Sequence, residues 1–174
     1  KVYDTASTAV TEGHGIAGDV FTDNNQIYDN IAYGNQGGCV HLYGSANINI
    51  YNNSCYGNVQ NASHSIPGEI SLYDDVTGGD RTANVNVKNN AVYATAAGAY
   101  AIYVSTIVEN NTGISITNND WYRTSGNWYF DGAGGATLAT WNAKSYVGTD
   151  LNADPLFVNP TTNFRLISIS TLIA

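Results

Sequence analysis

The chain has 174 residues and a net charge of −8, and only 11% of its residues are charged. Its 14 acidic residues outnumber six basic ones without forming a run, which argues against a nucleic-acid surface, because phosphate binding needs clustered Lys and Arg. No stretch approaches the roughly 20 apolar residues of a membrane-spanning helix, so the sequence predicts no membrane span.

The chain is long enough for one domain with a sizeable core, and its 23 Asn, 18 Gly and 13 Tyr favour strands and turns over helix. Residues 1–14 are polar, and we expect an N-terminal segment that leaves the fold uncapped, with His14 in a loop. The first residue is not Met, so we also expect a preceding segment or leader. Repeated units then occupy residues 15–131, and a closing segment occupies residues 132–174.

Five short segments with period-two alternation recur in the repeated region and are expected to form equivalent strands. They span residues 18–23, 38–44, 68–74, 100–106 and 127–132. Alternation places two columns of side chains on the inner face of these strands. The columns are Val20, Val40, Ile70, Ile102 and Trp128, followed by Thr22, Leu42, Leu72, Val104 and Phe130.

A second motif follows each of the first four strands and consists of a strand, an Asn corner and a short third strand. It occupies residues 25–35, 48–58, 85–95 and 114–124. Its constant columns are Ile27, Ile50, Val87 and Ile116, then Asn30, Asn53, Asn90 and Asn119, then Tyr33, Tyr56, Tyr93 and Tyr122. Such a unit cannot bury its apolar face alone and must stack on its neighbours. We therefore predict a solenoid of about five coils, with Asn amides hydrogen-bonded from coil to coil at corners that tolerate left-handed backbone.

The two cysteines allow two interpretations. Cys55 shares a column with Ala32, Val92 and Trp121, which favours a free thiol that fills the core. A disulfide between Cys39 and Cys55 is the alternative.

This arrangement resembles the right-handed parallel β-helix repeat proteins, the pectate-lyase-like superfamily of polysaccharide lyases, polygalacturonase-type hydrolases and alginate epimerases. The resemblance covers residues 15–131 and rests on the "NN" corners and on first strands such as "GCVHLYG". Residues 141–166, "WNAKSYVGTDLNADPLFVNPTTNFRL", are similar to the tail that closes many bacterial members. The resemblance implies a right-handed parallel β-helix, a secreted or cell-surface location, and a polysaccharide or oligosaccharide bound along the outer face of the first strands.

That outer face is aromatic and acidic, unlike an ordinary solvated strand. The expected outward residues are Phe21, His41, Ser71, Tyr103 and Tyr129 in the centre, with Asp19, Cys39, Glu69, Tyr43 and Tyr73 among the flanks. Tyr rings offer flat amphipathic faces to pyranose rings, although Tyr is also simply a favourable strand residue. The candidate substrate-binding residues are Tyr43, Tyr73, Tyr103, Tyr129 and His64.

Two long loops, 57–68 and 73–84, interrupt an otherwise short-looped chain, and long loops often carry function. We expect these loops to meet the strand face and to form a cleft. The candidate catalytic residues in this cleft are His41, Glu69, Asp74, Asp75 and Arg81.

Two chemistries fit such a cleft. Glycoside hydrolysis needs two carboxyl groups, which Glu69 with Asp74 or Asp75 could supply. Lyase or epimerase chemistry needs a base beside a uronate, here His41 or Arg81, and a cation that stabilises the developing charge. Calcium would be held by Asp19, Glu69 and Asp75. Neither set reproduces a catalytic signature of the family, and paired acids in a Gly-rich bend are also common turn formers.

Two interpretations of function follow. The first is a carbohydrate-binding or polysaccharide-processing protein with its groove on the first-strand face, whether or not it is a lyase or glycoside hydrolase. The second is a structural or protein-interaction solenoid that forms homo-oligomers through uncapped coil ends, where strand edges are unpaired. The aromatic face favours the first interpretation, and the missing signature favours the second.

Overall fold

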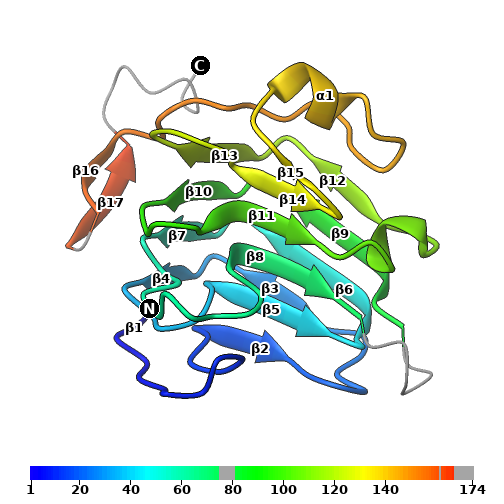
Figure 1. The fold of residues 1–174 in the computed structure, drawn as a ribbon, viewed down its shortest axis with the longest axis horizontal. Helices are drawn as coiled ribbons and strands as arrows, with labels where there is room; N and C mark the ends of the chain where they lie inside the picture. The colour runs from blue at the N-terminus through cyan, green and yellow to red at the C-terminus, as the bar shows by residue number, and fades with distance from the viewer. Residues whose placement is uncertain (75–80, 161, 167–174) are drawn as a thin grey trace.

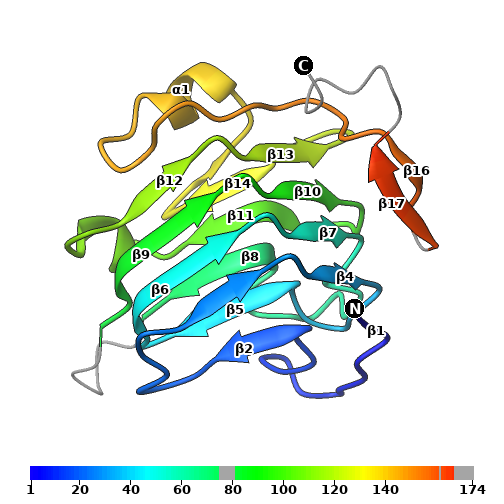
Figure 2. The same ribbon diagram turned by 180° about the vertical axis from the view of Figure 1, so that it is seen from behind.

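The fold is all-β and contains three parallel sheets, as the computed structural model shows for residues 1–74, 81–160 and 162–166 (Figures 1 and 2). The first sheet contains β2 (Ile16–Gly18), β5 (Val40–Tyr43), β8 (Gly68–Tyr73), β11 (Tyr100–Val104), β14 (Tyr129–Asp131) and the antiparallel β15 (Gly134–Gly135). The second sheet contains β3 (Gln26–Tyr28), β6 (Ala46–Tyr51), β9 (Ala83–Lys88) and β12 (Ser115–Thr117). The third sheet contains β1 (Val2–Tyr3), β4 (Ile31–Tyr33), β7 (Ser54–Tyr56), β10 (Ala91–Ala94) and β13 (Asp120–Arg123).

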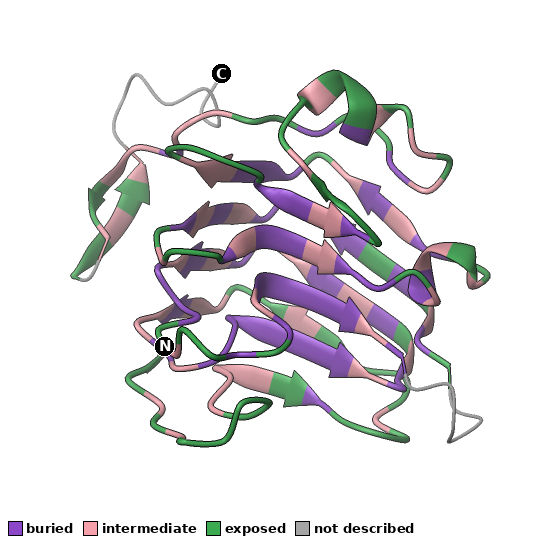
Figure 3. Ribbon diagram, viewed as in Figure 1, coloured by how far each residue is buried: buried purple, intermediate pink, exposed green. Residues whose placement is uncertain are grey.

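The chain visits the three sheets in turn, so each sheet takes every third strand. In the first sheet Val40 pairs with Ile70, and Ile70 pairs with Ile102. In the second sheet Ile50 pairs with Val87 and Val87 with Ile116. All of these side chains are buried between the sheets, and Figure 3 shows the resulting band of buried strands. The predicted columns are therefore confirmed for the middle repeats.

The predicted register is wrong at both ends of the first sheet. The first strand is β2, so Ile16, rather than Val20, is the residue that pairs with Val40. A Cβ atom on Gly18 would lie 2.8 Å from Leu42, so a glycine is what lets this segment approach β5. In the last strand Tyr129 pairs with Ile102. Tyr129 is accordingly buried in the core and not on the outer face.

A second error concerns the residue just before each inner column. Cys39 and Glu69 were expected to point outward because each precedes an inward residue. Both are 0% exposed, as is Ala101 at the equivalent place before Ile102, and Trp128, the next in the series, is 2% exposed. The chain turns a corner here, so two successive side chains enter the core and the period-two rule fails.

The two residues of each "NN" corner have different structural roles. The first position adopts left-handed backbone, with φ of 53° at Asp29, 56° at Asn52, 55° at Asn89 and 57° at Asn118. A short polar side chain is well suited to that conformation. The second position points inward and forms the Asn ladder of Asn30, Asn53, Asn90 and Asn119, in which Asn30 is half-buried and the other three are buried.

Each Asn of the ladder donates two hydrogen bonds to the side-chain oxygen of the next. The backbone N–H and the Nδ2 of Asn53 lie 3.0 and 2.9 Å from Asn90 Oδ1, and those of Asn90 lie 3.0 and 2.8 Å from Asn119 Oδ1. Asn119 donates in the same way to Asp150 Oδ1. The other oxygen of Asp150 accepts from the indole N–H groups of Trp121 and Trp141, each at 2.8 Å. A carboxylate, which only accepts, ends the row of donors.

A shorter ladder follows the same rule. Thr5 donates to Asn35 Oδ1, Asn35 donates to Asn58 Oδ1, and Asn58 donates to both oxygens of Glu69 at 2.7 and 2.6 Å. Burial raises the pKa of Glu69 to about 8, and the two bonds from Asn58 oppose that rise. Glu69 is thus the structural end of a ladder.

The two cysteines form a disulfide, so the preference for free thiols is wrong. Cys39 enters the core at a corner before β5, and Cys55 enters it from β7, where the two side chains meet. The bond closes a segment with a sequence separation of 16 residues. Closing a loop of that size stabilises a fold by about 3 kcal/mol, chiefly by restricting the unfolded chain.

Residues after β14 cover one end and one side of the sheets. Helix α1 (Leu138–Asn142), capped by the Thr137 hydroxyl, buries Trp141 at the end beyond β12 and β14 (Figure 1). The hairpin of β16 (Phe157–Asn159) and β17 (Asn163–Leu166) lies beside the third sheet. There Phe157 contacts Tyr56 and Phe164 contacts Tyr33. The Tyr column of the third sheet, which contains Tyr33 and Tyr56, therefore packs against neighbouring side chains of the same chain.

We expect Asn90→Ala to lower the free energy of unfolding by about 3 kcal/mol, because the donors of Asn53 and the backbone acceptors Ile50 and Lys88 would lose a buried partner. Urea unfolding followed by circular dichroism measures this change. The control is Asn86→Ala, which breaks an exposed amide pair with Asn49 and should cost less than about 1 kcal/mol. Equal losses in the two variants would show that the buried ladder contributes no more to the free energy of unfolding than an exposed amide pair does.

Candidate functional site

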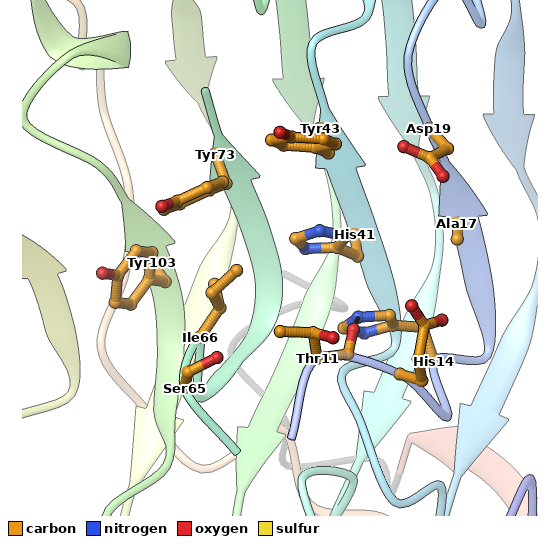
Figure 4. A pocket seen from close by; sticks show the side chains of 11 residues that line it. Thr11, His14, Ala17, Asp19, His41, Tyr43, Ser65, Ile66, Tyr73 and Tyr103 are labelled. Carbon is orange, nitrogen blue, oxygen red and sulfur yellow. Dashed lines mark hydrogen bonds between the residues drawn. The ribbon is translucent and has the colours of Figure 1, made fainter. Parts of the chain in front are cut away.

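A pocket of about 510 Å³ opens on the outer face of the first sheet (Figure 4). Strands β2, β5, β8 and β11 form its floor, and two loops form its walls. Its lining residues are Thr11, Glu12, His14, Ala17, Asp19, His41, Tyr43, Ser65, Ile66, Tyr73 and Tyr103. The volume lies within the range of small-molecule sites.

The walls are the N-terminal segment and the loop before β8, and they are bound to each other. Ser65 donates its backbone N–H to Val10 O at 2.8 Å, and Asn61 Nδ2 donates to Ala9 O. The N-terminal segment also reaches the floor, because Gly37 N–H donates to Gly13 O at 2.8 Å. Loop and segment thus hold a fixed position over the first sheet.

The three histidines of the chain form a cluster in which His14 and His41 line the pocket and His64 contacts His14. The rings of His14 and His41 are stacked with centroids 4.2 Å apart, and His64 meets His14 edge-on at 5.0 Å. His14 Nδ1 accepts from Gly38 N–H and its Nε2 lies 2.9 Å from Thr11 O, an arrangement that requires the neutral ring.

The surroundings keep these imidazoles uncharged. Burial, followed by the charge of His64, lowers the pKa of His14 to about 4. Burial, followed by the charges of His14 and His64, lowers the pKa of His41 to about 3. Burial also lowers the pKa of His64, against the opposing effect of the Glu12 carbonyl, although His64 Nε2 has no hydrogen bond of ordinary geometry among the described residues. The cluster is neutral at neutral pH.

Aromatic rings form the other half of the pocket. Tyr43 and Tyr73 are in register on β5 and β8, with centroids 5.7 Å apart. Tyr103 lies on β11 and stacks on Phe130 at 4.5 Å, which extends the aromatic surface beyond the pocket. Burial raises the pKa of Tyr103, so its hydroxyl stays protonated and can donate a hydrogen bond.

Five of the sequence candidates are brought together here: Asp19, His41, Tyr43, Tyr73 and Tyr103. His64 stands behind the wall, in contact with His14. Phe130 takes the outward position that was assigned to Tyr129. The first-strand face is therefore the pocket floor, as its column of His41, Ser71 and Tyr103 predicts.

The other candidates lie elsewhere. Glu69 is in the core and is bound by Asn58. Asp74 is buried and accepts from Asn111 Nδ2 at 2.8 Å, outside the pocket. Arg81 is exposed and does not line the pocket, and Asp75 lies outside the described residues. The proposed carboxyl pair is thus not assembled by the part of the chain that the structure describes.

The predicted calcium site is likewise not brought together. Asp19 is on the surface and Glu69 is inside the core, with both oxygens engaged. Within residues 1–74, 81–160 and 162–166, no three His, Cys, Asp or Glu side chains are placed so that they could hold a metal ion. The three histidines do not converge on one point, because two of them stack.

Sequence reasoning missed the N-terminal wall. His14 was assigned to a loop without a role and Glu12 was not singled out, yet both line the pocket. The signal available in the sequence was His14 itself, because it is one of only three histidines and stands between two glycines. His14 packs against a third glycine, Gly37, where a Cβ atom would lie 2.7 Å from His14 Nδ1.

The arrangement is better suited to binding than to turnover. His41 faces the pocket, but a pKa of about 3 makes a weak general base at neutral pH. The lining residues include no Lys or Arg that could stabilise developing negative charge. What the pocket offers is flat aromatic surface beside neutral hydrogen-bonding groups.

No family model, curated protein or solved structure matches this chain. Among the described residues, no helix has both the length and the apolar character to cross a membrane. The site must therefore be interpreted from its own geometry.

We expect the histidine cluster to make the fold sensitive to acid. The pKa values of His14 and His41 in the folded chain lie below their ordinary value of 6.5, so the unfolded chain binds more protons below that pH. Their stabilising contribution is complete above about pH 6.5 and is lost as the pH falls toward 4, by up to about 1.4 kcal/mol per pH unit for each histidine. Urea unfolding between pH 7 and 4 should show a smaller loss in a His14→Gln/His41→Gln variant than in the parent.

Glu69→Gln is the control for this measurement, because Glu69 acts with the opposite sign. Its pKa in the folded chain lies above its ordinary value of 4.5, so its contribution is lost as the pH rises from about 4.5 to 8. Replacing it should therefore make the loss of stability on acidification steeper, whereas replacing the histidines should make it shallower. Parallel curves for the histidine variant and the parent would contradict the proposed cause of acid sensitivity.

Proposed function

We propose that this protein is a carbohydrate-binding, right-handed parallel β-helix whose polysaccharide or oligosaccharide ligand occupies the pocket on the first sheet. The observation that carries this proposal is the pocket of about 510 Å³ lined by Tyr43, Tyr73 and Tyr103. Tyrosine combines a flat apolar face for a sugar ring with a hydroxyl for its polar edge. The neutral His41 adds a further hydrogen-bonding group.

The fold proposal rests on the three parallel sheets, the visit to each sheet in turn, and the buried Asn ladder. Parallel strands joined by crossover connections are almost always right-handed, which supports the proposed handedness. The likeness to the pectate-lyase-like superfamily rests on the same features. In this proposal the chain shares the scaffold of that superfamily and uses it for recognition.

A secreted or cell-surface location belongs to the same proposal. The support is the Cys39–Cys55 disulfide, which is fully buried. Disulfides persist in oxidising compartments and are rare in the reducing cytosol. Extracellular glycans are the polymers that such a protein would meet.

We expect Tyr73→Ala and Tyr103→Ala each to weaken glycan binding about three- to tenfold, because each removes roughly 1 kcal/mol of ring contact. Binding to an array of neutral, acidic and amino-sugar glycans, followed by titration calorimetry, measures the effect. Addition of calcium or of a chelator should change little, since the described residues place no metal site here.

Tyr28→Ala is the matched control. Tyr28 stacks on Tyr51 at 5.0 Å on the second sheet, so the variant removes the same kind of ring from a different face. Its binding should equal that of the parent. Weakening of equal size in all three variants would remove the pocket from the proposed function.

Self-association is a second candidate function, and exposed apolar side chains at one end favour it. Strands β2 and β3 are the edges of their sheets, and nearby Phe21 and Tyr28 are 74% and 49% exposed. The opposite end is covered by α1 with its buried Trp141. Two copies would therefore pair through their uncovered ends, in a symmetric contact.

We expect Phe21→Asn to shift such a dimer to monomer without loss of the fold. Phe21 has a φ of 63°, a conformation that Asn adopts more readily than Phe, so the change removes the ring and relieves the backbone. Sedimentation velocity over a range of concentrations measures the mass of the parent and the variant. A parent that is monomeric throughout would reject self-association.

A further inference from the structure

We propose that the pocket on the first sheet prefers sugars that carry a protonated amine, the class represented by glucosamine oligomers, to sugars that carry carboxylates. This inference rests on the proposed carbohydrate function and adds the charge of the ligand. It departs from uronate recognition, for which a cationic site or a bound cation would be needed.

Among the described residues, the charged groups that line the pocket are all acidic. Glu12 lies on the N-terminal wall and Asp19 follows β2 on the floor, and both side chains are exposed at the mouth of the pocket. None of the lining residues is Lys or Arg. The net charge of −8 on the whole chain adds to the same negative field. A uronate would be repelled by these groups, and an ammonium group would be attracted.

The histidines do not reverse this balance. His14 engages both ring nitrogens with Gly38 N–H and Thr11 O, so a proton on the ring would break an existing hydrogen bond. The carboxyl group of Glu12 and the neighbouring rings face the cluster, and no basic residue does among the pocket residues. The three rings add neutral polar surface to an acidic site.

His41 is an independent sign that the pocket is built for a ligand. Its side chain is only 8% exposed, and its Nδ1 lies 3.1 Å from the Ser71 hydroxyl. The ring lines the pocket between Tyr43 and His14 (Figure 4). Its Nε2 has no hydrogen-bond partner within the described ranges and is not sealed in the core. When Ser71 accepts from Nδ1–H, Nε2 is an acceptor that an amine or a hydroxyl group of the ligand would satisfy.

The tyrosines complete the site for a cation. Aromatic faces attract ammonium groups, and this chain already uses that interaction elsewhere. Lys88 Nζ lies 5.6 Å from the ring centre of Tyr51, and Lys1 Nζ lies 5.3 Å from that of Tyr33. In the pocket, Tyr73 and Tyr103 present the same kind of ring beside acidic side chains, and the ammonium group would come from the ligand.

The test compares three oligosaccharides of equal length by titration calorimetry at pH 6 and low salt: glucosamine, N-acetylglucosamine and galacturonate hexamers. At pH 6 the free amine is protonated, while His14 and His41 stay neutral because their pKa values are about 4 and 3. We expect the glucosamine hexamer to bind at least tenfold more tightly than the acetylated one, and galacturonate to bind most weakly. Added salt should shrink the difference.

The decisive variant is Glu12→Gln/Asp19→Asn, which removes both carboxylates and keeps the shape of the side chains. The ratio between the glucosamine and acetylated affinities should fall about tenfold, toward one. The matched control is Asp29→Asn/Glu109→Gln, which removes two carboxylates from outside the pocket and should leave that ratio unchanged. An equal fall in both variants would mean that only the net charge of the chain matters, and would overturn the inference.

The outcomes separate this inference from the proposed function. If the acetylated or the acidic oligosaccharide binds as tightly as glucosamine or more tightly, the preference for an amine is wrong and carbohydrate binding stands. If no oligosaccharide binds, both proposals fail. Tight glucosamine binding that Glu12→Gln/Asp19→Asn abolishes would support both.

Discussion

The buried hydrogen bonds between Asn side chains are the constraint on which the rest of the structure depends. An amide in such a row must donate in one direction and accept in the other, so neighbouring repeats can stack in only one register. Asn90 lies in the middle of the longer row, and a shift of one residue would leave its donors and acceptors unpaired in the core. The rows also have a defined end, because the last acceptor of each row is a carboxyl group, Asp150 or Glu69, and not another Asn. The positions of the Asn residues in the sequence therefore determine the register in which the repeats stack.

The register of the strands also determines which side chains meet in the pocket. Because the repeats cannot slip, Tyr43 stays opposite Tyr73, and His41 stays beside Ser71. The N-terminal wall is fixed through the shorter ladder, since Thr5 donates to Asn35 in the same manner as the ladder residues donate to each other. Rigid strands and a tied wall form a preorganised site, which reduces the entropy that a ligand must lose on binding. The structural ladder and the proposed binding surface thus belong to the same repeats.

The sequence allowed prediction of what is periodic and not of what breaks the period. The columns of the middle repeats, the Asn ladder and the outward positions of His41 and Tyr103 follow from alternation and from the recurring "NN" pair. Glu69 and Cys39 were misplaced because the chain turns a corner where two successive side chains enter the core. The place of His14 could not be predicted, since it depends on how a nonrepeating segment folds back on β5. The disulfide was the less favoured alternative for a related reason, as its two residues meet only when that corner is formed.

The acidic residues show why composition alone could not assign the site. Glu69 has no charged partner, and burial raises its pKa to about 8 while Asn58 holds both of its oxygens. Asp150 is the last acceptor of the other ladder, where it accepts hydrogen bonds from Asn119 and two indole groups. Glu12 and Asp19 instead lie in solvent at the pocket mouth, where a charge keeps its hydration and can still attract a ligand. A carboxyl group inside the stack completes a hydrogen-bonded row and is no longer available for recognition. In the proposed function, recognition therefore falls to Glu12 and Asp19, whose carboxyl groups are not part of a ladder.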